Sequence, residues 1–176
     1  MSFPASADVL PVYYDRQPSA SRGAYANPPA IEGGLYPPAA GGDASVLWAF
    51  GHGLSYDAAF RYSELAVEPR VVGARGAARV SFLVTNNGTR DAEEVAQLYV
   101  ADDVASVATP VQRLRGFARV AVRAGESARV AFALDVAEHL WLVDVDYNRV
   151  VEPGNFTLMV GGASDAIQLQ TKLLVV

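Results

Sequence analysis

From about residue 60 onward, hydrophobic and polar residues alternate along a series of short segments. A period of two is typical of a β-strand that buries one face and exposes the other. Turn sequences such as Asn86-Asn87-Gly88 and Ala124-Gly125-Glu126 separate these segments. The alternation predicts strands at about residues 61–67, 79–85, 96–100, 118–123, 128–135, 155–160 and 167–173.

Short strands joined by turns predict an all-β fold, namely an antiparallel β-sandwich of the immunoglobulin-like type. The length from residue 60 onward is close to the ~100 residues of such a sandwich. One helical turn is expected at residues 136–140, because Asp135 can act as its N-cap. A hairpin turn is expected around Asp146-Tyr147-Asn148-Arg149.

The N-terminal part of the chain, up to about residue 47, has a different composition. Seven of the ten prolines lie there. Proline removes a backbone donor and fixes φ, so neither a regular helix nor a central strand is expected. The same part holds four tyrosines that need a surface to cover, which favours an extended arm over a partly ordered tail: Tyr13, Tyr14, Tyr25 and Tyr36. We therefore predict a Pro-rich arm or linker at residues 1–59 and the sandwich at residues 60–176.

Length, composition and charge exclude several classes of protein. A (β/α)₈ barrel typically takes ~250 residues, whereas this chain has 176. The chain is 51% hydrophobic and 19% charged, which suits a folded domain. A net charge of -5 predicts no nucleic-acid and no anionic-membrane partner. The absence of cysteine from the sequence excludes disulfides and thiolate chemistry.

Targeting signals do not assign a compartment. No apolar run approaches the ~20 residues of a membrane span. The start, Met1-Ser2-Phe3-Pro4, lacks the basic and apolar regions of a signal peptide. A cytoplasmic location and an exported one, with the signal further upstream, both stay open.

The polar residues do not form a catalytic or metal-binding pattern. His52 and His139 stand in separate segments without ligand spacing, so we predict no metal and no cofactor. Asp144 and Asp146 could suggest calcium, but the ligand series of an EF-hand loop is absent from the sequence. No pair of carboxylates stands out as a glycosidase pair, and no nucleophile elbow or phosphate loop occurs. We therefore predict no catalytic residue in this chain.

Aromatic residues are the more informative surface feature. The alternation places Phe117 on the polar side of its strand, and we predict Tyr99 and Trp141 at the surface as well. A large apolar residue in such a position is either isolated or part of an interface. The aromatic arm favours an interface.

Several strings follow one another in a fixed order along the chain. The first is Trp48-Ala49-Phe50-Gly51-His52-Gly53-Leu54-Ser55-Tyr56, and Phe60-Arg61-Tyr62-Ser63-Glu64-Leu65 continues it. Further strings lie at residues 2–4, 12–14, 93–100, 110–117, 151–156 and 159–162. In this order they resemble glycoside hydrolase family 3 enzymes, whose members contain a Phe-Gly-x-Gly-Leu-Ser-Tyr segment.

The resemblance implies a role without catalysis. In that family a barrel and an α/β sandwich domain form the active site, and a C-terminal fibronectin type III-like domain follows them in many members. Only this last domain and its lead-in resemble the present chain, and no position matches the nucleophilic aspartate or the acid/base carboxylate. Met1 then occupies a position that is internal in longer relatives, so we expect a fragment or truncated chain.

The function implied by the resemblance is that of a C-terminal docking module of a β-glucosidase- or β-xylosidase-type enzyme. Its partners would be the catalytic domains, in cis or as a separate chain. We predict the docking residues to be Phe50, His52, Tyr56, Phe117 and Trp141.

Two alternatives remain open at this point. A free-standing glycan- or surface-binding module could stack Tyr25, Tyr36 and Trp48 on sugar rings and make weak carbohydrate contacts. The arm and the docking face could also pair with a second copy of the chain by self-association.

Overall fold

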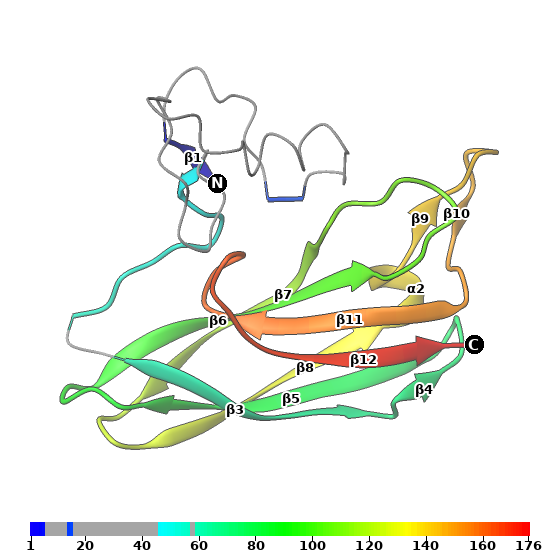
Figure 1. Ribbon diagram of the computed structural model, residues 1–176. Helices are drawn as coiled ribbons and strands as arrows, with labels where there is room; N and C mark the ends of the chain where they lie inside the picture. Colours follow the sequence, from blue (N-terminus) through cyan, green and yellow to red (C-terminus); the bar gives the residue numbers. More distant parts are fainter. Residues whose placement is uncertain (6–13, 16–45, 57–58) are drawn as a thin grey trace, which may run out of the picture.

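The computed structural model describes residues 1–5, 14–15, 46–56 and 59–176. Most of the predicted arm, including Tyr13, Tyr25 and Tyr36, lies outside these residues. The described residues form an antiparallel β-sandwich, which confirms the predicted fold class (Figure 1).

Two sheets make up the sandwich. A five-stranded sheet has the order β4-β12-β11-β6-β7, and a three-stranded sheet has the order β3-β5-β8. All seven predicted strands are present as β3 (Phe60–Glu68), β5 (Ala77–Asn86), β6 (Ala92–Asp102), β7 (Arg113–Val122), β8 (Ser127–Asp135), β11 (Gly154–Gly161) and β12 (Ile167–Val175). The short strand β4 (Val71–Val72) runs parallel to the end of β12 and was not predicted.

The core lies between the two sheets and follows the predicted alternation. Val80, Phe82 and Val84 of β5 are fully buried, and they alternate with half-buried or exposed neighbours. The rings of Tyr62 and Phe82 stack at 5.5 Å between centroids. Facing them from the five-stranded sheet are buried residues of three strands: Ala96, Leu98, Val100, Phe156, Leu158, Val160, Leu173 and Val175.

One edge of the sandwich is closed by a side chain. Gln168 on β12 accepts a hydrogen bond from the backbone N–H of Tyr62 (3.0 Å) and donates one to the carbonyl of Phe60 (3.1 Å). A single amide therefore joins β12 of one sheet to β3 of the other.

Strand β3 contains a bulge that the sequence did not predict. Ser63 pairs with Leu83 and Ala66 pairs with Ser81, so Glu64 and Leu65 together face one residue of β5. Glu64 has a φ of 54°, the left-handed conformation found at some bulges. Its carboxylate pairs with Arg129 of β8 at 2.8 Å.

The predicted turns have specific causes. Asn86 is buried, donates to the carbonyls of Arg90 and Val122, and accepts a hydrogen bond from Gly88 N–H. Gly125 has a φ of 75°, which a residue without a Cβ adopts readily. Both predicted turn sequences therefore end their strands as expected.

The predicted helical turn is also confirmed. Helix α2 (Val136–His139) begins after Asp135, whose carboxylate accepts a hydrogen bond from Glu138 N–H at 3.0 Å. The chain then forms a hairpin of β9 (Leu142–Val143) and β10 (Arg149–Val150), with the predicted turn between them. No helical segment in the part of the chain that the structure describes has the length and apolar character needed to cross a membrane.

Candidate docking face

Phe50 and Gly51, shortly before the sandwich, contact the outer surface of the five-stranded sheet. We call residues 46–56 the lead-in segment. It begins with β2 (Val46–Trp48), which pairs with β1 (Phe3–Pro4). At the other end of the contact, the carbonyl of Phe50 accepts a hydrogen bond from Ser164 N–H at 2.9 Å.

Tyr14 packs against the Phe50 ring. The two rings stack at 4.1 Å, and the Tyr14 ring meets Tyr99 edge-on at 5.9 Å. The Tyr14 hydroxyl also accepts a hydrogen bond from Leu114 N–H on β7 (3.2 Å). Three aromatic rings thus cover the part of the sheet where β6 and β7 pair.

Gln97 is the polar centre of this contact. Its side-chain amide donates to the carbonyls of Gly51 (3.3 Å) and Gly162, and its oxygen accepts a hydrogen bond from the Tyr99 hydroxyl (2.5 Å). Gln97 is buried although it lies on the outer face of its strand. One side chain therefore joins the lead-in segment, β6 and the end of β11.

The prediction that Tyr99 lies at the surface is wrong. Alternation does place Tyr99 on the outer side of β6, but the lead-in segment and Tyr14 cover it, and it is fully buried. Burial raises the pKa of the Tyr99 hydroxyl, and Tyr14 and Asp165 raise it further. As a result residues 96–100 form an unbroken buried run on a strand that is covered on both faces.

Phe117 lies at the border of the covered area. It pairs in register with Gln97, but its side chain is 71% exposed, as the alternation predicted. Next to it Arg119 pairs with Glu93, which marks a charged limit to the apolar surface. Strand β7 is an edge strand of the described sheet, so Phe117 is open to contact from outside.

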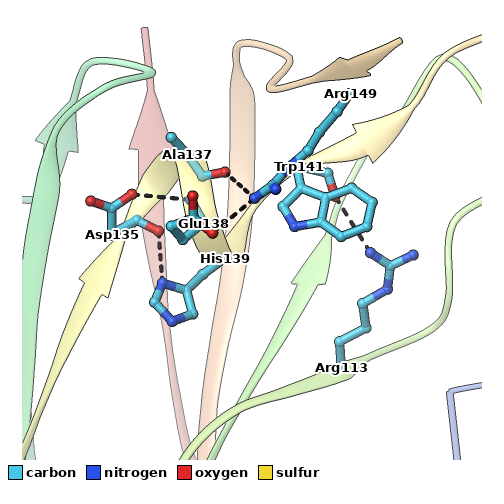
Figure 2. Close-up of polar contacts among 7 residues, drawn as sticks. All are labelled: Arg113, Asp135, Ala137, Glu138, His139, Trp141 and Arg149. Atoms are coloured by element: carbon cyan, nitrogen blue, oxygen red, sulfur yellow. Dashed lines mark hydrogen bonds and ion pairs between the residues drawn. The ribbon is translucent and has the colours of Figure 1, made fainter. Parts of the chain in front are cut away.

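Trp141 lies apart from this face, between α2 and the β9–β10 hairpin. Figure 2 shows its indole flanked by Arg113 and Arg149. The guanidinium carbons lie 5.7 Å and 4.6 Å from the ring centroid. Arg149 also donates to the carbonyl of Ala137 (2.9 Å) and pairs with Glu138 (3.1 Å). Trp141 is half-buried, so the structure gives it a packing contact within the domain as well as a surface.

The remaining predicted docking residues are open to solvent. Tyr56 is 93% exposed. His52 is exposed and lies parallel to Trp48, with 6.3 Å between the ring centroids. The structure thus brings Phe50 and Phe117 to the surroundings of Gln97, while Trp141 belongs to a different part of the sandwich.

Two cavities in the described part of the chain do not form a ligand site from the predicted residues. One cavity of about 30 Å³ is bordered by Asp102, Arg115 and Trp141, among others. Burial raises the pKa of Asp102 and lowers that of Arg115, but the volume is far below the ~300 Å³ of a small-molecule pocket. A larger open depression of about 490 Å³ near Glu93 and Arg123 has no aromatic residue on its walls.

The described residues also contain no cluster of side chains that could bind a metal ion. Within the described residues there is no group of three or more His, Asp or Glu side chains placed to hold an ion. Asp144 instead accepts hydrogen bonds from the backbone N–H groups of Asp146 (2.9 Å) and Asn148 (2.8 Å), as a turn residue does.

Comparison with known protein families identifies the sandwich. The family described as "Fibronectin type III-like domain" matches residues 94–164. The chain carries a fibronectin type III-like domain. The match begins on β6 and ends at Ser164, so it spans the strands that form the contact with the lead-in segment.

Relatives of this domain are parts of larger glycosidases. A β-xylosidase from Formosa agariphila is 36% identical over 100% of this chain and 22% of its own length. A periplasmic β-glucosidase from Salmonella typhimurium is 34% identical over 92% of this chain and 20% of its own. A solved β-glucosidase from Erythrobacter marinus superimposes with a TM-score of 0.78 at 34% identity, over 96% of this chain and 20% of that one. The chain therefore spans about a fifth of the length of these relatives.

Sequence reasoning missed two residues: Gln97, which organises this face, and Arg149, which packs on Trp141 outside it. Alternation along β6 predicts that Gln97 lies on the exposed side of this strand, and the adjacent residues of the strand do not distinguish it from a solvated glutamine. The sequence predicts Arg149 only as part of a turn. A signal existed for Gln97 in the Phe50-Gly51 string, since a glycine beside an aromatic residue permits close approach of a backbone.

Proposed function

We propose that this chain is the non-catalytic C-terminal docking module of a family 3 glycoside hydrolase of β-glucosidase or β-xylosidase type. One observation carries the proposal: 100% of the chain matches 22% of the length of an enzyme named as a β-xylosidase, and 92% of it matches 20% of the length of one named as a β-glucosidase. The catalytic domains are its partners in cis. In this proposal residues 1–59 lead from those domains, and residues 60–176 form the docked sandwich.

Each docking residue has a role in this proposal. Phe50 attaches the lead-in segment to the sandwich through Tyr14 and Ser164. Phe117, Tyr56 and His52 present exposed surface to the catalytic domains, and exposed aromatics of this kind contribute most of the affinity at interfaces. Trp141 stiffens the hairpin base and adds a smaller area of contact.

The decisive experiment is a chimera. The matching 22% of the Formosa agariphila β-xylosidase is replaced by this chain, and hydrolysis of an aryl β-xyloside is measured alongside thermal unfolding. We expect the chimera to hydrolyse the substrate and to unfold in one transition, and the 176-residue chain alone to show no hydrolysis. Turnover by the pure 176-residue chain would overturn the proposal, and so would a chimera whose sandwich unfolds independently.

Phe117→Ser tests the surface within that chimera. We expect it to lower the melting temperature of the chimera while leaving that of the isolated chain almost unchanged, because Phe117 is exposed in the isolated chain. Val104→Ser is the matched control, since Val104 is 83% exposed and lies outside the predicted docking set.

A further inference from the structure

The tip of the β9–β10 hairpin carries three exposed apolar side chains. Val143 is 46% exposed, Val145 is 78% exposed and Tyr147 is 91% exposed. We call these three residues the hairpin tip. Isolated exposed apolar residues are common, but three within five positions of one projecting turn form a patch.

The hairpin that carries this patch is held rigidly at both ends. At the turn, the Asp144 carboxylate accepts hydrogen bonds from Asp146 and Asn148 N–H, and Asp144 N–H donates to the Asn148 carbonyl at 3.0 Å. At the base, Arg149 packs on Trp141 and bonds to Ala137 and Glu138 (Figure 2). A rigid presentation lowers the entropy lost on binding.

Tyr147 has an unfavourable backbone conformation. Its φ is 61°, in the left-handed region that glycine and asparagine adopt at lower cost than a bulky aromatic residue. Within the described residues the ring makes no aromatic contact and the hydroxyl makes no hydrogen bond. The turn holds this backbone, because Tyr147 N–H donates to the Asp144 carbonyl at 3.2 Å, and it leaves the tyrosine ring exposed.

We propose that the hairpin tip is a second docking contact, in which Tyr147 and its flanking valines enter an apolar depression on the catalytic domains. The inference rests on the proposed function and adds the partner contact made by this end of the sandwich. Figure 1 shows the hairpin and the β1–β2 pair on the same side of the five-stranded sheet, away from the three-stranded sheet. We expect a partner on that side to contact both.

A protein partner fits the tip better than a sugar. Two of the three side chains are aliphatic, and valine has no aromatic face or polar group for a sugar ring. Tyrosine is also enriched at the centre of protein interfaces. The depression that receives the tip is expected to have hydrogen-bond donors at its rim, because the Asp146 carboxylate is exposed beside Tyr147.

The test uses Tyr147→Asn in two settings. In the isolated 176-residue chain we expect the melting temperature to rise by about 2 to 4 °C, because asparagine tolerates the left-handed conformation. In the β-xylosidase chimera we expect it to fall, because the docking contact is lost. Val145→Ser is a second variant that leaves the backbone strain in place, and it should lower only the melting temperature of the chimera.

The outcomes separate this inference from the proposed function. If Phe117→Ser weakens the chimera but neither tip variant does, the hairpin contact is wrong and the docking function stands. If the sandwich and the catalytic domains of the chimera unfold independently, both the proposed function and the hairpin contact are overturned. Xylobiose or cellobiose binding to the isolated chain that Tyr147→Asn abolishes would assign the tip to a sugar, and concentration-dependent dimerisation that it abolishes would assign the tip to a second copy.

Discussion

The side-chain amide of Gln97 occupies the space that a side chain on Gly51 would need. A Cβ built on Gly51 would lie 2.7 Å from Gln97 Nε2 and 2.9 Å from Gln97 Cδ, closer than real Cβ contacts. The φ of Gly51 is 83°, which also disfavours any other residue. The close approach lets the Gly51 carbonyl accept a hydrogen bond from Gln97.

Gly51→Ala should therefore detach the lead-in segment. We expect a loss of about 1 to 3 kcal/mol in the free energy of unfolding, from the strained φ and the overlap with Gln97. The local readout is hydrogen exchange of the Ser164 N–H, which donates to Phe50 and should lose protection. Gly53→Ala is the control, since a Cβ there meets no atom within 4 Å. Unchanged Ser164 protection in Gly51→Ala would contradict the account.

The Glu94–Tyr62 pair should make stability depend on pH. Burial raises the pKa of Glu94 above 4.5, although the Tyr62 hydroxyl, which donates to it at 2.8 Å, lowers it in part. The folded state therefore holds a proton that the unfolded state releases near pH 4.5. This contribution to stability is complete below that pH and is lost as the pH rises through the folded pKa.

Glu94→Gln removes this titration and keeps an oxygen that accepts the Tyr62 hydrogen bond. We expect the variant to gain in melting temperature relative to the natural chain as the pH rises from about 4 to 7. Tyr62→Phe should extend the loss of stability to higher pH, because one of the two groups that lower the Glu94 pKa is then gone, while the backbone N–H of Val95 remains. A melting-temperature difference between Glu94→Gln and the natural chain that stays constant with pH would refute the assignment.

Gly116 on β7 lets the two sheets approach each other. A Cβ at this position would lie 3.0 Å from Cδ1 and 3.3 Å from Cε1 of Phe132 on β8. We expect Gly116→Ala to cost about 1 to 3 kcal/mol in a urea titration, as overpacking does. Adding Phe132→Leu should recover part of the loss, and Gly154→Ala, which meets no atom within 4 Å, should cost less. Equal losses at Gly116 and Gly154 would remove the packing explanation.

Arg149 is expected to contribute more than an ordinary surface arginine. It stacks on Trp141, bonds to the Ala137 carbonyl and pairs with Glu138, whereas Arg129 pairs with Glu64 alone. We expect Arg149→Leu to lower the free energy of unfolding by about 1 kcal/mol and Arg129→Leu by less than about 0.5 kcal/mol. The comparison is made by urea unfolding at fixed salt, and similar losses for the two variants would show that the indole contact adds nothing.

The strands were predictable because one face of each is buried against the other sheet. Val80, Phe82 and Val84 alternate with polar or exposed residues, so the period of two was visible in the sequence. The turn at Asn86 and the cap at Asp135 were predictable for a similar reason, since each depends on one side chain and its own neighbours.

Features that depend on distant segments were not predictable. Tyr99 has the periodicity of an exposed residue, and only the position of Phe50 and Tyr14 in space explains its burial. The bulge at Glu64 contains no glycine, the residue that would have indicated a bulge in the sequence. The hairpin tip gave no signal either, because a tyrosine in a predicted turn does not indicate its φ.

Strand β6 is covered on both faces, and this affects where the chain can be shortened for recombinant production. A version starting at residue 60 would still contain every strand of both main sheets. It would nevertheless open Gln97 and Tyr99 to water, and Ser164 N–H would lose the Phe50 carbonyl that accepts its hydrogen bond. The smallest unit expected to behave as a well-packed recombinant product therefore includes the Phe50-Gly51 stretch, even though those residues belong to no strand of the sandwich.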